Sequence, residues 1–135
     1  MKFFSTIALL LLPLCVFAQQ KSPLDDPEQE KKFYESIETT VNRYTDLLEL
    51  DDWQIFYVDS ILTHDYLGMM EELNELNRAK VSNADLFVKC QDRWQEKIYN
   101  AFQSVFNEDQ WAKYLKSGAA RDKKSRDKRE AKRNL

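Results

Sequence analysis

Residues that interrupt helices and strands, form disulfide bridges or commonly act in catalysis are scarce in this sequence. Its 135 residues include two glycines, three prolines, two cysteines and one histidine. So few turn-forming residues argue against a β-rich fold, in which turns separate short strands. A lone histidine, His64, offers no partner set for nucleophilic catalysis or for a metal centre with several converging ligands. We therefore predict an all-α protein that is not an enzyme and holds no metal or other cofactor.

His64 is predicted to be solvated. Its neighbour Asp65 should point away from it, because adjacent side chains diverge on a helix. Gly68 occupies the position four residues further on, where a second metal ligand would be needed. This glycine weakens a helix by about 1 kcal/mol relative to alanine, and we expect it to permit a bend or a close helix crossing.

The first 18 residues have the layout of an export signal. A short positive start precedes an almost wholly apolar run over 3–17, and polar residues follow. Val16 and Ala18 stand at the −3 and −1 positions, which predicts cleavage after Ala18. Lipoprotein processing at Cys15 is the less favoured alternative, because a bulky leucine precedes that cysteine. This segment is therefore predicted to be a signal peptide (residues 1–18) and the mature protein to be periplasmic.

Three stripes of apolar residues recur at steps of three and four, the spacing of one helix face. Asp26 followed by Pro27 marks the start of the first helix, which spans about 22 residues. Cys90, the only cysteine after cleavage, lies on the third stripe and is predicted to be buried and inert. The stripes are Phe33, Ile37, Val41, Tyr44 and Leu48; Ile55, Val58, Leu62, Tyr66, Met69, Leu73 and Leu76; and Phe87, Cys90, Trp94, Ile98, Ala101 and Val105.

A short break over 77–81 separates the second and third stripes. Ser82 is predicted to cap the third helix, with Asp85 at position N3. Two long helices joined by a short link fold back on each other, which predicts a long antiparallel helical hairpin. A fourth helix, ended or interrupted by Gly118, completes a predicted all-helical domain over 19–117.

Two five-residue segments repeat one signal at the starts of two predicted helices: Leu50-Asp51-Asp52-Trp53-Gln54 and Phe106-Asn107-Glu108-Asp109-Gln110. Each has an apolar residue, then a capping Asp or Asn, then a Gln three positions after the cap. This order predicts a capping box behind a hydrophobic staple. The caps would accept from N–H groups of the first turn, and Gln54 and Gln110 would reach back to the caps. Leu50 is predicted to pack against Phe56 or Tyr57, and Phe106 against Lys113 or Tyr114.

The paired segments resemble the L-T-x-x-Q motifs of the Spy/CpxP-like periplasmic proteins. Asp51 and Asn107 stand in place of Thr, and both are competent caps, while Phe106 stands in place of Leu. The resemblance implies four helices around the long hairpin and a homodimer. It also implies an ATP-independent chaperone or envelope-stress adaptor that binds unfolded or envelope proteins. The Gln-rich start after Ala18 is similar to exported proteins of the Bacteroidota. The client-binding face of the family is basic, and this chain departs from that pattern because its body is acidic.

Secondary apolar stripes are candidates for a client-binding surface. Either outer helices or a dimer partner cover them as core, or clients bind there. Trp53, Tyr57 and Ile61 add further apolar faces at the start of the second helix, which is expected to be buried on more than one side or to contact a second subunit. The candidate residues are Phe56, Leu67 and Met70 on the second helix and Tyr99 and Phe102 on the third.

Charge is divided between the body of the chain and its C-terminal end. The last twenty residues hold nine basic and three acidic side chains, whereas the preceding mature chain holds ten basic and twenty acidic ones. Such a basic end attracts anionic partners or the acidic body of its own chain. Residues 118–135 are predicted to be a basic charged tail, either a solvated helix extension or a disordered segment, with Arg126 paired to Asp122 and Glu130.

The tail supports an alternative function. A non-enzymatic envelope-binding module would use it on an anionic envelope surface such as lipid, peptidoglycan or lipopolysaccharide. The predicted export argues against a nucleic-acid partner. Because acidic residues are interleaved with the basic ones, a solubilising role is the simpler interpretation of the tail.

Overall fold

Helical segments account for the regular structure of this protein. The computed structural model describes residue 22 and residues 24–135, and the predicted signal peptide with its cleavage site lies outside these residues. No strand occurs in this part of the chain, so the all-α prediction is confirmed. The elements are α1 (Pro27–Leu48), α2 (Asp52–Arg78), α3 (Ala84–Val105), α4 (Glu108–Tyr114), the short π-helical turn η1 (Leu115–Ala119) and α5 (Ala120–Arg133).

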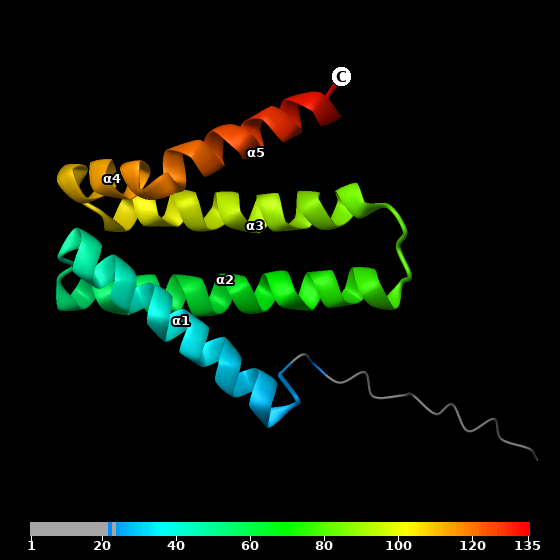
Figure 1. The fold of residues 1–135 in the computed structure, drawn as a ribbon, viewed down its shortest axis with the longest axis horizontal. Helices are drawn as coiled ribbons and strands as arrows, with labels where there is room; N and C mark the ends of the chain where they lie inside the picture. The colour runs from blue at the N-terminus through cyan, green and yellow to red at the C-terminus, as the bar shows by residue number, and fades with distance from the viewer. Residues whose placement is uncertain (1–21, 23) are drawn as a thin grey trace, which may run out of the picture.

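A long hairpin organises these helices. α2 and α3 lie side by side and antiparallel, joined by a short link, as Figure 1 shows. α1 crosses α2 obliquely, and α4 and α5 run back along the other side of α3 (Figure 1). None of the helices described here combines the length and the apolar content that crossing a membrane requires.

Local capping explains where α1 begins. Asp26 has an extended backbone, and its side chain accepts a hydrogen bond from the Glu28 N–H at 3.1 Å. Pro27 follows at the first helical position, where its missing N–H costs nothing. The helix spans 22 residues and ends at Glu49, whose φ is 52°. The first helix therefore forms with the start and length that the sequence predicts.

The cap of α3 differs from the prediction by one residue. Asn83, not Ser82, is the N-cap, and its side chain accepts from the Asp85 N–H at 3.0 Å. Asp85 therefore sits at N2. The reason is that the chain stays extended through Asn83, so helical geometry begins only at Ala84.

The apolar core is concentrated at the end of the hairpin that carries the two repeated segments. Aromatic edge contacts tie its layers together, because the Tyr114 ring lies 5.7 Å from Tyr44 and 5.6 Å from Phe102. Toward the tip of the hairpin, the seam residues of α2 are only partly buried. The buried core cluster comprises Phe33, Ile37, Val41, Leu48, Leu50, Val58, Leu62, Ile98, Phe102, Val105, Phe106 and Tyr114.

Gly68 marks the closest approach of α2 to a side chain of α3. A Cβ at this position would lie 2.5 Å from the indole ring of Trp94, so only glycine leaves room for that ring. The Trp94 indole N–H also donates to Glu72 at 2.7 Å. Of the two expected roles, Gly68 therefore serves a close helix contact, and α2 continues through it without interruption.

Gly118 interrupts the fourth helix without ending the helical chain. Its φ is 124°, a region that side-chain-bearing residues rarely adopt, and it lies inside η1. The chain then continues as α5 to Arg133. The tail predicted for 118–135 is thus helical over most of its length.

Candidate functional site

The two repeated segments meet in the core through their glutamines. Gln54 Oε1 accepts from the Asp51 N–H at 2.9 Å, and Gln110 Oε1 accepts from the Asn107 N–H at 3.0 Å. The side chain of Asn107 in turn accepts from the Gln110 N–H at 2.8 Å. Each glutamine Nε2 also donates to the Oε1 of the other, at 2.6 Å and 3.0 Å. The capping boxes of α2 and α4 are therefore joined to each other, an arrangement that we call the glutamine pair.

The glutamine pair also reaches the ends of two other helices. Gln54 Nε2 donates to the Val105 carbonyl at the end of α3, at 3.0 Å. Gln110 Nε2 donates to the Leu48 carbonyl at the end of α1, at 3.3 Å. Both glutamines are buried. Because all their polar atoms are used in joining four helix ends, the pair is a structural device without free groups for chemistry.

The apolar staple residues behave differently at the two segments. The Phe106 ring lies 5.5 Å from that of Tyr114, one of its two predicted partners. Leu50 is buried in the core cluster, whereas its predicted partners Phe56 and Tyr57 are exposed to solvent. Leu50 therefore packs with the core, and its contact with Phe56 or Tyr57 stays a prediction.

The predicted client-binding residues separate into three groups by exposure. Phe102 is 1% exposed and lies in the core, so its ring is not available at the surface. Leu67, Met70 and Tyr99 are partly buried and pack against the core. Phe56 is 66% exposed and is the one member of the set that faces solvent. The reason is packing: Phe102 turns toward Tyr44, Phe106 and Tyr114, whereas nothing in the described chain covers Phe56.

Phe56 belongs to a cluster of exposed rings that we call the aromatic patch, formed by Trp53, Phe56 and Tyr57. Trp53 is 53% exposed and Tyr57 is 51% exposed. The ring centroid of Tyr57 lies 6.1 Å from that of Trp53 and 5.6 Å from that of Phe56, in edge contacts. The expectation that this stretch is buried on several sides within the chain is therefore wrong. Trp53 and Tyr57 were missed as surface candidates because their spacing alone does not reveal their exposure.

Arginine side chains hold α5 against α3. Arg126 donates through Nε and Nη2 to Glu96, at 3.2 Å each, and is itself buried. Arg129 forms a two-pronged pair with Asp92 at 2.8 Å and 2.7 Å. The predicted pairs of Arg126 with Asp122 and Glu130 do not form. A carboxylate on the facing helix offers two hydrogen bonds in a partly buried site, which outweighs an exposed pair within one helix.

The ion pairs between the helices continue along α5. Arg133 donates to both Asp85 and Asp92, and Lys123 donates to Glu96 at 2.5 Å. The hydrogen bonds from Arg129 hold the pKa of the Asp92 carboxyl below its usual range. The basic end thus attaches to the acidic body of its own chain, one of the two expectations from the charge distribution. A freely solvated tail does not describe this arrangement.

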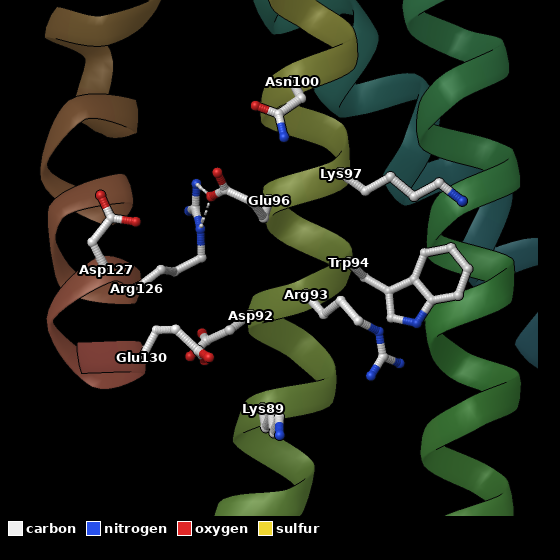
Figure 2. Close-up of a pocket in the computed structure, with 10 residues that line it drawn as sticks. All are labelled: Lys89, Asp92, Arg93, Trp94, Glu96, Lys97, Asn100, Arg126, Asp127 and Glu130. Carbon is white, nitrogen blue, oxygen red and sulfur yellow. Dashed lines mark hydrogen bonds and ion pairs between the residues drawn. The ribbon is translucent and has the colours of Figure 1, made fainter. Parts of the chain in front are cut away.

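A cleft of about 730 Å³ lies along α3 between α5 and Trp94. Figure 2 shows Arg126, Asp127 and Glu130 on the α5 side and the Trp94 ring turned toward α2. Both walls carry charges of both signs. α3 supplies the cations Lys89, Arg93 and Lys97 and the carboxylates of Asp92 and Glu96, and α5 supplies Arg126, Asp127 and Glu130. The cleft has no serine, cysteine or histidine in its lining, so it holds no Ser–His or Cys–His pair.

The histidine and the cysteine of the described chain lie in opposite environments, one at the surface and one in the interior. His64 is exposed as predicted, but its Nδ1 lies 2.7 Å from Asp65 Oδ1, so the two side chains do not diverge. The Asp65 side chain is buried, whereas the His64 ring is 75% exposed. Cys90 is buried as predicted, and burial raises the pKa of its thiol, which makes it less reactive. Among residues 22 and 24–135, no group of three or more His, Cys, Asp or Glu residues forms a metal site.

The fold defines an all-α protein built on a long helical hairpin. Comparison with protein-family models, with curated proteins and with solved structures gave no match for this chain.

Proposed function

We propose that this protein is a periplasmic, ATP-independent chaperone-like protein, or an envelope-stress adaptor, that binds apolar segments of unfolded or partner proteins. The observation that carries this proposal is the aromatic patch. Tryptophan, tyrosine and phenylalanine bury large apolar areas and dominate binding energetics at protein surfaces. Three of them, with Tyr57 in edge contact with both Trp53 and Phe56 and each ring more than half exposed, form a surface that gains from being covered.

The chemistry of the patch fits weak and adaptable binding. It lies on the first two turns of one helix and its rings are more than half exposed, so an extended apolar segment can lie across it in several registers. Exposed Asp51, Asp52 and Asp59 stand next to it in the sequence. These carboxylates favour clients that carry positive charge beside the apolar segment. The family resemblance supports the same role, with an acidic surface where the family has a basic one.

An aggregation assay tests this proposal. Substoichiometric to equimolar protein should slow the aggregation of a thermally unfolding client without ATP. Replacing the three rings together (Trp53→Ser, Phe56→Ser, Tyr57→Ser) should remove most of this effect. The matched control replaces three exposed apolar residues elsewhere, Tyr34→Ser, Leu86→Ser and Val88→Ser, and should retain it. Absence of protection across several unrelated clients, or equal loss in both variants, would contradict the proposal.

The homodimer implied by the resemblance is part of the proposal, with its interface away from the aromatic patch. Sedimentation equilibrium of the wild type and of the triple patch variant distinguishes this dimer from one in which the second copy covers the aromatic patch. If the variant alone becomes monomeric and still protects clients, a second copy of the chain covers the patch and client binding there is wrong. If both proteins have the same mass and only the wild type protects, the patch is the client surface.

A further inference from the structure

Basic side chains occupy two opposite sides of α5. The inner side faces α3, where Arg126, Arg129 and Arg133 are hydrogen-bonded to carboxylates. At about 100° per residue, the remaining basic residues of the helix, apart from Lys123, fall within an arc of roughly 80° on the opposite side. We call this exposed set the outer face of α5: Arg121, Lys124, Lys128 and Lys132.

The outer face carries charge of a single sign. Among residues 24–135, no acidic side chain forms an ion pair with any of its three lysines. Arg121 approaches Asp122 at 3.8 Å, and both side chains are highly exposed. The other two acidic residues of α5 pair with Lys123 and Arg133 instead. Two of the three acidic residues of α5 therefore pair with residues outside this face, and Asp122 lies beside one of its members, Arg121.

The two sides of α5 use different cations. All three pairings that fix the helix through forked hydrogen bonds use arginine, whose planar guanidinium matches a carboxylate. The outer face is mainly lysine, whose compact and strongly hydrated charge sits on a flexible stem. Three arginines, together with Lys123 through its hydrogen bond to Glu96, therefore set the position of the helix, and the three lysines of the outer face are left to interact with something outside the molecule.

The position of α5 leaves the outer face accessible. Figure 1 shows α5 as the outermost helix beside α3, on the side of the hairpin away from α1. Its contacts within the described chain run to α3 and η1. The acidic body thus lies behind the helix, and the resulting dipole would orient the outer face toward an anionic surface.

We propose that the outer face of α5 binds the surface of a membrane that contains anionic lipids. A row of lysines along one straight helix, without a pocket for a single ion, matches diffuse negative charge spread over a plane. The outer face has no aromatic ring for base stacking, and a single arginine, so it lacks the groups that favour nucleic acid. This proposal goes beyond client binding and gives the alternative function, an envelope-binding module, a defined face and partner.

Vesicle co-sedimentation tests this assignment. The full chain is mixed with phosphatidylcholine vesicles that either contain or lack phosphatidylglycerol, and the difference in affinity is measured. Lys124→Gln, Lys128→Gln and Lys132→Gln together should weaken binding to the anionic vesicles by roughly a hundredfold, or about fivefold per lysine. The apolar segment over 3–17 is present in every variant, so its contribution cancels when variants are compared on the same vesicles.

A charge-matched variant is the control. Lys31→Gln, Lys32→Gln and Lys89→Gln remove the same number of exposed lysines from α1 and α3 and should leave anionic-vesicle binding within about threefold of wild type. Circular dichroism checks that both variants keep their helices. Equal losses in the two variants, or no preference of the wild type for anionic vesicles, would overturn the proposal. Tighter binding to polyphosphate or duplex DNA than to vesicles, with the same lysine dependence, would overturn the lipid assignment. A chain that binds vesicles but fails to protect clients would leave this proposal intact.

Discussion

Two regions of this protein hold helices together by different physical means. At the motif-bearing end of the hairpin, the neutral glutamine pair is enclosed by the apolar core and joins four helix ends. Along α5, the buried residue is a charged one, Arg126, and the contact with α3 consists of ion pairs. The first region depends on excluding water. The second depends on charge and is therefore open to salt, acid and competing ions.

The comparison suggests that the hairpin base is the stable unit and α5 an attached arm. Burying two carboxamides costs little free energy when they hydrogen-bond to each other, because these bonds replace the ones they made to water. The pair also fixes one register for the helices that it joins. Ion pairs at a partly exposed interface contribute less, because water and salt screen them. Four substitutions or conditions test this ranking, from the largest expected effect to the smallest.

Removal of the central core ring should cause the largest loss. Phe102→Ala creates a cavity beside Tyr44, Phe106 and Tyr114 and should lower the free energy of unfolding by about 4 kcal/mol. Urea denaturation followed by circular dichroism measures it. Phe56→Ala, at an exposed position, is the control and should change stability by less than about 0.5 kcal/mol. Similar losses in the two variants would contradict the assignment of Phe102 to the core.

Breaking the glutamine pair should cost slightly less. Gln110→Leu strands the Asn107 N–H and the Leu48 carbonyl in an apolar site, removes one partner from each polar atom of the Gln54 carboxamide, and should destabilise the protein by about 3 kcal/mol. The same denaturation experiment applies. The double variant Gln54→Leu, Gln110→Leu should lose clearly less than the two single losses combined, because the residues act as one unit. Additive losses would show that the two capping boxes are independent.

Loosening α5 should leave the hairpin base unchanged. Arg129→Gln removes the two-pronged pair with Asp92 and should weaken the docking of α5 by about 1 kcal/mol, and high salt should have a similar effect. Amide hydrogen exchange resolves this by region. Exchange should accelerate over 120–133 and stay constant in α2. Faster exchange throughout the protein would mean that α5 is integral to the core.

Acid should produce the smallest and most selective effect. The hydrogen bonds from Arg129 lower the pKa of Asp92 in the folded state. The stabilisation from this pair is therefore fully present above the unfolded pKa of about 4 and is lost as pH falls through the lower folded value. Exchange over 120–133 measured as pH falls below about 4 should show the loss. Arg129→Gln should flatten that dependence, and an unchanged profile in the variant would exclude Asp92 as its source.

Local features of the structure were predictable because their physics spans only three or four residues. The start of α1 follows from Asp26 and Pro27, and the burial of Ile37 and Cys90 follows from helical spacing. Capping depends on the backbone of a single turn, so the starts of α2 and α4 could also be predicted from the sequence. Asn83 displaced Ser82 as a cap because two capping residues stood side by side and only the chain path chose between them.

The exposure of a side chain could not be predicted from its position on an apolar stripe. Phe56 and Phe102 each lie on a secondary apolar stripe, yet one is at the surface and the other is enclosed. The difference is set by which helices lie above them, because the aromatic side chains of α1 and α4 reach Phe102 and leave Phe56 uncovered. The pattern indicates that a face is apolar and does not indicate what covers it.

The sequence by itself determined the helical class, the positions of most helix ends and the opposite charges of body and tail, because these depend on neighbours along the chain or on composition. The tertiary structure decided that Gln54 meets Gln110 and that Arg126 meets Glu96 in preference to Asp122 or Glu130. These contacts join residues far apart in sequence, and they form because folding brings buried partners into a low-dielectric setting where a well-made hydrogen bond outweighs an exposed local one.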